Sequence, residues 1–274
     1  MFEEILNNVA TKMPLIHCIT NYVTVNDCAN ILLACGGSPI MADDEQEAAE
    51  ITSICDGLTI NIGTLNSRTI HSMLKAGQRA NQLGHPVVLD PVGAGASELR
   101  TQTTRRLLEQ VRFSVIRGNS SEIKTVAQGS GFTKGVDAAA VDATTAQNFE
   151  QVAAYAKQLS QTTGAVIAIT GAIDLIAASE RVYMIRNGHP MMSKVSGTGC
   201  MLSAVIAAFV AANPTQPLDA TAAAVCAMGL CGELAFQQIQ AAGGGTASLR
   251  IALIDQMSRL DAATLNGGAK IEAR

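Results

Sequence analysis

The residues best suited to chemistry in this chain lie in the short stretch Gly197-Thr198-Gly199-Cys200. Gly197 and Gly199 permit backbone conformations closed to other residues, so successive N–H groups can converge on one ligand. The apolar run that follows predicts a helix over 199–212, whose positive N-terminal end favours a phosphate or a developing oxyanion. Cys200 falls in the first turn, where a thiol can have a lowered pKa, so it is a candidate base or nucleophile. The stretch predicts an anion site, although a turn that only opens a helix has a similar composition.

Two acidic residues near the ends of predicted strands form a candidate metal site. Asp90 ends a strongly apolar run, and Glu122 follows the next predicted strand. Carboxylates at adjacent strand ends can hold Mg²⁺ directly or through its waters. Local alternatives exist for both residues. Asp90 could form a turn with its own backbone before Pro91, and Glu122 could be an acid in the first turn of a helix.

Arg117 and Thr170 end two further predicted strands and could contact a phosphate or a ribose. The guanidinium of Arg117 is planar and always charged, which suits a phosphate contact, although a salt bridge to a neighbouring acid is the alternative. A strand-ending turn explains Thr170 and Gly171 equally well. Lys194 could contact phosphate too, but a solvated surface lysine is the simpler interpretation.

Several familiar kinds of site are missing from the sequence. It has no Gly-Lys-Ser/Thr phosphate loop, and Gly93-Ala94-Gly95 lacks the third glycine of a dinucleotide turn. The four histidines show no metal-ligand spacing, and none is identified as a partner for a nucleophilic cysteine. The seven cysteines are scattered, without a Cys-x-x-Cys motif. We expect the six other than Cys200 to be reduced core residues.

Composition excludes further classes of protein. Apolar residues make up 48% of the 274 residues and charged residues 15%, which is too apolar for a disordered chain. The net charge of −4 and the absence of a Lys/Arg run argue against nucleic acid as a partner. The apolar run 200–212 is shorter than the roughly 18 residues of a membrane span. The acidic start does not resemble a secretory signal, so we expect no membrane association and a cytoplasmic protein.

Alternating patterns predict the fold class. Short apolar runs alternate with helical patterns, which is typical of an α/β fold with a mostly parallel sheet between two helical layers. The predicted strands are 15–19, 39–41, 57–62, 86–90, 114–117 and 165–170, and the predicted helices are 26–35, 44–53, 66–83, 98–110, 146–161, 199–212, 218–241 and 246–260. Runs 175–178 and 182–185 flank a polar turn and predict an antiparallel hairpin at one edge.

The chain shows no repeat and no long linker, so we expect a single three-layer αβα domain over 1–274. Thr246 is a possible N-cap of its helix. The segment 129–145 is polar and small enough for a mobile surface loop. In such sheets ligands collect at the carboxyl ends of the strands, where the candidate residues repeatedly fall.

The combination of motifs resembles the ribokinase-like superfamily. The resemblance is carried, in this order, by Asp90-Pro91-Val92-Gly93, Asn119-x-x-Glu122 and Gly197-Thr198-Gly199-Cys200. Further details resemble the hydroxyethylthiazole kinase family of thiamine salvage, namely Ile19-Thr20-Asn21-Tyr22-Val23, Ser38-Pro39-Ile40-Met41 and a cysteine instead of an aspartate after the glycine loop. The resemblance covers about residues 5 to 260. It implies phosphorylation of the hydroxyl of 4-methyl-5-(2-hydroxyethyl)thiazole by ATP, with Mg²⁺.

The resemblance also implies roles for residues. Cys200 is the catalytic candidate beside the substrate hydroxyl, and a thiol is mostly protonated near its reference pKa of about 8.5 unless the helix end lowers it. The substrate-binding candidates are Asn21, Val23, Met41, Gly63 and Gly197. The ATP- and phosphate-binding candidates are Arg117, Thr170, Gly197, Thr198 and Gly199, and the metal candidates are Asp90 and Glu122. The family is typically a homotrimer with sites at subunit boundaries, which we carry over as an expectation.

Three alternatives stay open at this point. The first is a ribokinase-like kinase of another small alcohol, such as hydroxymethylpyrimidine or a sugar. The second is an acyl or thiol enzyme with Cys200 as the covalent nucleophile. The third is a nucleotide-binding protein without catalysis, against which the joint presence of Asp90, Glu122, Arg117 and the glycine loop argues.

Overall fold

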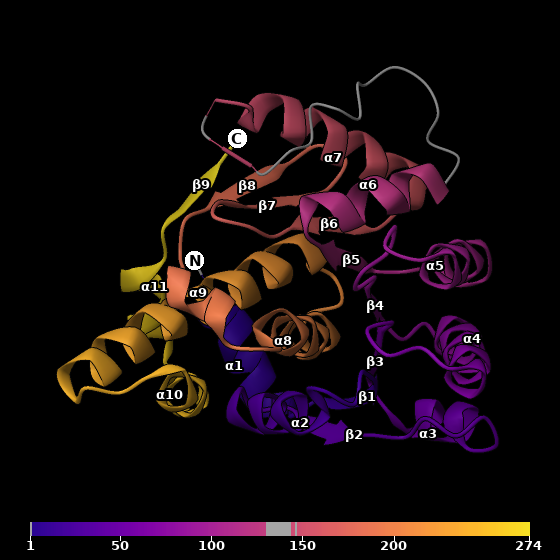
Figure 1. Ribbon diagram of the computed structural model, residues 1–274, viewed down its shortest axis with the longest axis horizontal. Coiled ribbons are helices and arrows are strands. Elements are labelled where there is room, and N and C mark those ends of the chain that lie inside the picture. Colours follow the sequence, from indigo (N-terminus) through magenta and orange to yellow (C-terminus); the bar gives the residue numbers. More distant parts are fainter. Residues whose placement is uncertain (1, 130–143, 146) are drawn as a thin grey trace.

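Apolar, β-branched runs form the strands of one sheet that runs through the centre of the molecule. The computed structural model describes residues 2–129, 144–145 and 147–274 (Figure 1). Among these residues the sheet has nine strands in the order β2-β1-β3-β4-β5-β6-β7-β8-β9. The strands are β1 (Leu15–Ile19), β2 (Ser38–Ile40), β3 (Gly57–Asn61), β4 (Val87–Asp90), β5 (Val115–Gly118), β6 (Val166–Ile169), β7 (Asp174–Ala177), β8 (Val182–Ile185) and β9 (Ile271–Ala273).

Strand direction divides the sheet into two parts. β1 to β6 pair in parallel, whereas β6–β7, β7–β8 and β8–β9 pair antiparallel. The predicted mostly parallel sheet is therefore confirmed. The predicted edge hairpin is confirmed as well, with Ala177 opposite Val182 at the turn. The hairpin is not the last strand pair, because β9 adds to β8 from the far end of the chain.

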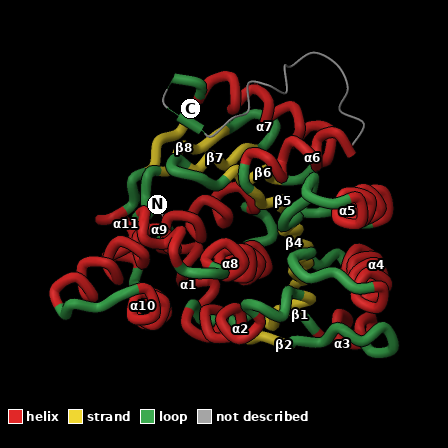
Figure 2. Tube along the Cα trace, in the orientation of Figure 1, coloured by secondary structure: helices red, strands yellow, loops and turns green. Residues whose placement is uncertain are grey.

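Helices cover both faces of the sheet, as Figures 1 and 2 show. They are α1 (Glu3–Lys12), α2 (Val25–Ala34), α3 (Ala48–Ile54), α4 (Ser67–Leu83), α5 (Glu98–Gln110), α6 (Ser120–Gly129), α7 (Phe149–Thr163), α8 (Thr198–Ala212), α9 (Pro217–Ala241), α10 (Thr246–Ser258) and α11 (Ala262–Gly268), with the 3₁₀ helix η2 (Pro190–Lys194). One apolar core lies under α4 to α7, and the other lies under α1, α2 and α8 to α11. The three-layer αβα prediction is confirmed.

α8 and α9 are the most apolar helices, and both are central. α8 packs against β1, β3 and β4, which brings its N-terminus to the carboxyl edge of the parallel strands. By length and hydropathy alone α9 could cross a membrane, a possibility that the sequence analysis overlooked. However, 83% of its apolar window is buried inside the protein, which is the pattern of a core helix.

Two local predictions concern the start of α10 and the segment that follows α6. Thr246 is not an N-cap: Gly245 holds that position with an extended backbone, and Thr246 is already the first helical residue. Its hydroxyl is therefore misplaced for capping. In the predicted surface loop 129–145, Gly129 ends α6, and residues 130–143 lie outside the described residues.

Candidate active site

The glycine-rich stretch opens α8 as predicted, with Gly197 as N-cap at a φ of +90°. A Cβ on Gly197 would lie 2.4 Å from Cγ2 of Thr24, and one on Gly199 would lie 2.6 Å from Nη1 of Arg117. Both glycines are thus needed for close packing. The helical bonds start with the Met201 N–H, which donates to the Gly197 carbonyl over 2.8 Å. The N–H groups of residues 198–200 come before this first helical hydrogen bond, so they have no partner within the helix and can bind an anion.

Cys200 lies in the first turn of α8 as predicted, but its pKa departs from expectation. The thiol is partly buried and accepts a hydrogen bond from Nδ2 of Asn21 over 3.1 Å. Burial raises the pKa of Cys200, and the charge of Asp90 adds to this effect. The possibility that the helix end lowers this pKa is not realised, because desolvation and the neighbouring carboxylate raise it. The thiol is protonated at neutral pH.

Asp90 ends β4 in a fully buried position. Its Oδ2 accepts hydrogen bonds from Nδ2 of Asn61 (2.9 Å) and Oγ of Ser203 (2.8 Å), and Nη1 of Arg117 lies 3.5 Å away. Burial raises the pKa of Asp90 to about 6, against the lowering effect of Arg117. Its Oδ1 is buried without a hydrogen-bond partner. The partners come from other elements, so Asp90 does not form the local turn considered as an alternative.

Glu122 lies beside Asp90 on α6, in the helix first turn that the alternative interpretation expected. Its Oε2 accepts from the Asn119 N–H (2.8 Å), and Asn119 Oδ1 accepts from the Glu122 N–H (2.9 Å). This is a reciprocal cap. Its Oε1 accepts from the Gly93 N–H over 2.9 Å and so ties the loop after β4 to α6. The proximity of Glu122 also raises the pKa of Asp90.

The two acids alone do not make a metal cage. Within the part of the chain that the structure describes, no group of three or more His, Cys, Asp or Glu side chains could hold a metal ion. Mg²⁺ commonly takes one or two carboxylates and fills its remaining positions with water and substrate phosphates. The unpartnered Oδ1 of Asp90 fits that arrangement.

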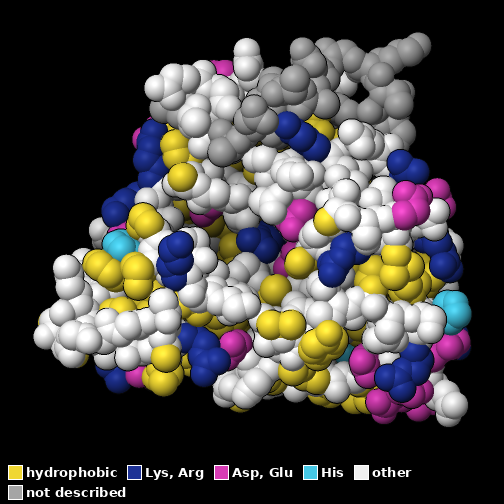
Figure 3. Space-filling view, viewed as in Figure 1, with side chains coloured by type: hydrophobic (Ala, Val, Ile, Leu, Met, Phe, Trp, Pro, Cys, Tyr) yellow, Lys and Arg dark blue, Asp and Glu magenta, His cyan; other side chains and the backbone are white. Residues whose placement is uncertain are grey.

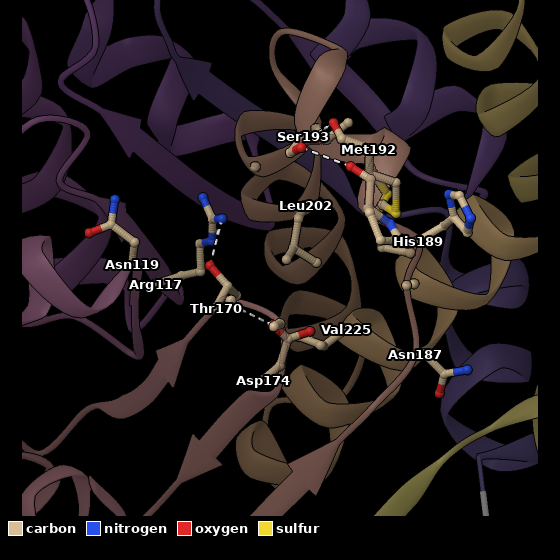
Figure 4. A pocket seen from close by; sticks show the side chains of 18 residues that line it. Arg117, Asn119, Thr170, Asp174, Asn187, His189, Met192, Ser193, Leu202 and Val225 are labelled. Carbon is tan, nitrogen blue, oxygen red and sulfur yellow. Dashed lines mark hydrogen bonds between the residues drawn. The ribbon is translucent and has the colours of Figure 1, made fainter. Parts of the chain in front are cut away.

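Arg117 and Thr170 meet at the end of neighbouring strands. Nη2 of Arg117 donates to Oγ1 of Thr170 over 2.7 Å, and the side chain is 13% exposed (Figure 4). The salt bridge considered as an alternative is thus present, in the form of the 3.5 Å pair with Asp90. Nε of Arg117 is buried without a partner. The face in Figure 3 brings basic and acidic side chains together near its centre.

A cavity of about 540 Å³ opens at this point. Its polar wall includes Arg117, Thr170, Thr198 and Gly199, and its apolar wall comes from α8 and α9. The predicted ATP and phosphate residues therefore share one cavity, apart from Gly197, which precedes them at the start of α8. Lys194 is exposed, as its surface interpretation expected.

The predicted substrate residues do not belong to the wall of this cavity. Asn21 is buried, and its Nδ2 also donates to Asn61 Oδ1 over 3.1 Å. Gly63 donates its N–H to the same Asn61 oxygen over 2.9 Å. Met41 is partly buried against a core, whereas Val23 is 61% exposed.

Sequence reasoning missed three positioning residues. Asn61 and Ser203 hold Asp90 by hydrogen bonds. The sequence offers only weak signals for this role: Asn61 stands at a strand end, and Ser203 follows Gly199 by one helical turn. His17 is buried, and its Nε2 donates to the Ala42 carbonyl over 2.7 Å. Burial lowers the pKa of His17, so the ring is neutral and fixes the loop after β2 that carries Met41.

Comparisons with known proteins agree with the geometry of this site. Residues 6–263 match the model of the hydroxyethylthiazole kinase family. The chain is 60% identical to a hydroxyethylthiazole kinase of Clostridium acetobutylicum over the full length of both. It is 49% identical to one of Desulfovibrio desulfuricans over 99% of this chain and 98% of the relative.

Solved structures point the same way. A hydroxyethylthiazole kinase protein from Pyrococcus horikoshii superposes with a TM-score of 0.87 at 35% identity, over 100% of this chain and 98% of the other. The pyridoxal kinase from Staphylococcus aureus, in complex with ADP, has a TM-score of 0.56 at 15% identity, over 77% of this chain and 85% of the other. The latter likeness concerns the fold alone.

Proposed function

Since this chain belongs to the hydroxyethylthiazole kinase family, it is an ATP-dependent kinase of the thiazole alcohol in thiamine salvage, and we propose how its residues divide the reaction. The γ-phosphoryl group passes from ATP to the hydroxyl of 4-methyl-5-(2-hydroxyethyl)thiazole. The observation that carries the assignment of roles is the meeting of Arg117, Asp90 and the start of α8 at one strand edge.

The start of α8 holds the phosphoryl group during transfer. Phosphoryl transfer asks mainly for positioning and for neutralisation of charge. The amides of Thr198, Gly199 and Cys200 point from a helix N-terminus, and Arg117 packs directly on Gly199. Donors fixed in advance stabilise charge without reorganising, so these groups lower the barrier. Thr170 holds Arg117 in place and faces the same phosphates.

Asp90 and Glu122 would hold Mg²⁺. When bound, the ion neutralises charge on the phosphate oxygens. Asp90 offers its unpartnered Oδ1, while Asn61 and Ser203 fix the orientation of the carboxylate. Glu122 keeps both oxygens on backbone N–H groups, and its carboxylate would add a second negative charge beside the ion.

Cys200 lies beside the substrate hydroxyl and accepts its proton. Because the pKa of the thiol is raised, only a small fraction is thiolate at neutral pH. Base catalysis is therefore weak in this enzyme. Asn21 donates to the sulfur and stabilises the thiolate that does form.

Asn21, Val23, Met41, Gly63 and Gly197 bind the thiazole alcohol. The exposure of Val23 supports a site completed by a second subunit, because a ring-binding side chain open to solvent would contribute little. We therefore assign a homotrimer with sites at subunit boundaries.

The net charge of −4 supports small metabolites rather than nucleic acid as partners, and we assign the protein to the cytoplasm.

The test is ADP formation by the purified protein with ATP, Mg²⁺ and the thiazole alcohol, with mass spectrometry of the phosphate ester. Hydroxymethylpyrimidine and ribose serve as competing acceptors at equal concentration. We expect the ester of the thiazole alcohol with the highest kcat/KM. A higher kcat/KM for another acceptor, or a covalent adduct on Cys200 during turnover, would contradict the proposal.

A further inference from the structure

Asp174 is a carboxylate in the wall of the cavity that neither the phosphate-binding nor the metal-binding groups use. It is the first residue of β7 and lies between Thr170 and Val225 (Figure 4). Its Oδ1 accepts the Gly171 N–H over 2.8 Å. No donor to its Oδ2 occurs among the described residues. One oxygen therefore fixes the turn after β6, and the other is free for a ligand.

The surroundings decide which ligand group this oxygen suits. Burial raises the pKa of Asp174 to about 7, against the lowering effects of the Gly171 N–H and of Arg117. The thiol of Cys226 on α9 also lies near Asp174, whereas His189 lies elsewhere in the wall of the same cavity. A carboxylate repels the phosphates of a nucleotide, but it is a strong acceptor for a hydroxyl group.

The position of Asp174 along the cavity points to the sugar. The hydrogen bond to Gly171 joins it to the residue next to Thr170, whose hydroxyl holds the phosphate-binding Arg117. On α8 and α9 the cavity is walled by Leu202, Val225 and Met228, which suit the flat, apolar faces of a base. The ribose of a nucleotide lies between its phosphates and its base. Asp174 therefore lies where a ribose passes.

We propose that Asp174 accepts a hydrogen bond from a ribose hydroxyl of ATP through Oδ2, and that it makes the enzyme selective for ribonucleotides. This inference rests on the proposed function, because it needs ATP in this cavity. A site that hydrogen-bonds a substrate hydroxyl discriminates against the analogue without it, since the acceptor is then left without its partner.

The test compares the binding of ATP, 2′-deoxyATP and 3′-deoxyATP by calorimetry, in the wild type and in Asp174→Asn. Asparagine keeps an oxygen for the Gly171 N–H but replaces the free acceptor with a donor. We expect the wild type to bind ATP about tenfold or more tightly than one of the deoxy analogues. This ratio should fall in Asp174→Asn, because a neutral amide is a weaker partner for a hydroxyl than a charged carboxylate, and it should fall close to one in Asp174→Ala, which also removes the Gly171 contact.

Asp261→Asn is the matched control, because Asp261 also accepts a backbone N–H, from Thr264, but caps α11 away from the cavity. It should keep the wild-type ratio. Equal binding of all three nucleotides by the wild type, or the same ratio in the wild type and Asp174→Asn, would overturn the inference. If Asp174 only held the turn, its substitution would weaken the binding of all three nucleotides equally. Since binding is measured without the alcohol, a failure of the kinase assay alone would count against the proposed function and not against Asp174.

Discussion

The two halves of the carboxyl edge use polar residues in different ways. On the side that we assign to the nucleotide, around β5 to β7, Nε of Arg117 is buried without a partner, and Oδ2 of Asp174 is left free toward the cavity. On the alcohol side, around β1 to β3, Asn21 and Asn61 bond to one another. Polar groups without a hydrogen-bond partner can bind a ligand, whereas polar groups that bond to one another fix the local structure. Under the proposed division of roles, the nucleotide half offers polar groups to a charged ligand, and the alcohol half has polar groups that fix its own structure.

Asp90 links the two halves. Asn61 reaches its Oδ2 from the alcohol side, and Arg117 approaches the same oxygen from the nucleotide side. Ser203 holds it from α8, which also carries Cys200. The reacting groups therefore meet around one buried carboxylate, and substitutions on the two sides should change different kinetic constants.

The largest expected effect is that of Arg117→Ala on the nucleotide side. Removal of a fixed donor to the transferring group typically costs 10²- to 10³-fold in rate, so we expect kcat to fall by about that factor. The KM for the thiazole alcohol should change little. Steady-state kinetics with each substrate varied in turn measures both, and circular dichroism checks the fold. A fall in kcat of less than about threefold would remove Arg117 from the transfer step.

Cys200 lies at the boundary of the two halves, and its substitution should have the next largest effect. General-base catalysis contributes about 10²- to 10⁴-fold, and a thiol with a raised pKa lies at the low end, so Cys200→Ala should lower kcat about 10²-fold. Cys200→Asp should keep or raise kcat, because a carboxylate needs no deprotonation at neutral pH. An unchanged kcat in Cys200→Ala would exclude the base role.

Asp90→Asn tests the linking carboxylate through stability. The pKa of Asp90 is raised to about 6 from an ordinary value of 3.8, so the folded protein holds this proton more tightly than the unfolded chain does. Its contribution to the unfolding free energy therefore falls as the pH rises from about 4 to about 6. We expect Asp90→Asn to be more stable than the wild type by up to about 3 kcal/mol above pH 6, and the difference to vanish near pH 4. Chemical denaturation without Mg²⁺ measures it, and a gap independent of pH would contradict the charge argument.

Gly63→Ala on the alcohol side should have the smallest effect. The new Cβ would lie 2.9 Å from Oδ1 of Asn61 and 3.0 Å from Cβ of Asn21, so this network must shift by a few tenths of an ångström. We expect the KM for the thiazole alcohol to rise a few-fold, with the KM for ATP unchanged. An increase in the KM for ATP alone would show that the two halves are wrongly divided.

The sequence predicted what depends on local patterns. The parallel strands and the β7–β8 hairpin follow from short apolar runs, and the first-turn position of Cys200 follows from the glycines before it. β9 escaped prediction because three residues of ordinary composition pair with a strand far away in the chain.

The electrostatic properties of the site could not be predicted. The raised pKa of Cys200 depends on burial and on Asp90, which is 110 positions earlier in the chain. The contact between Ser203 and Asp90 depends equally on how α8 packs across β4. Such contacts follow from the packing of whole layers and leave no trace in local spacing.

The measurement that tests the central claim most directly is kcat for Gly199→Ala, with Gly267→Ala as control. A Cβ at 199 would lie 2.6 Å from Nη1 and 2.7 Å from Nη2 of Arg117, so it must push the guanidinium out of the position in which Thr170 and Asp90 hold it. At Gly267, a Cβ meets nothing within 4 Å. If Arg117 and the start of α8 stabilise the transferring phosphoryl group, Gly199→Ala remains folded by circular dichroism and loses about 10²-fold in kcat, while the control keeps the wild-type kcat. A folded Gly199→Ala with wild-type kcat would contradict this account.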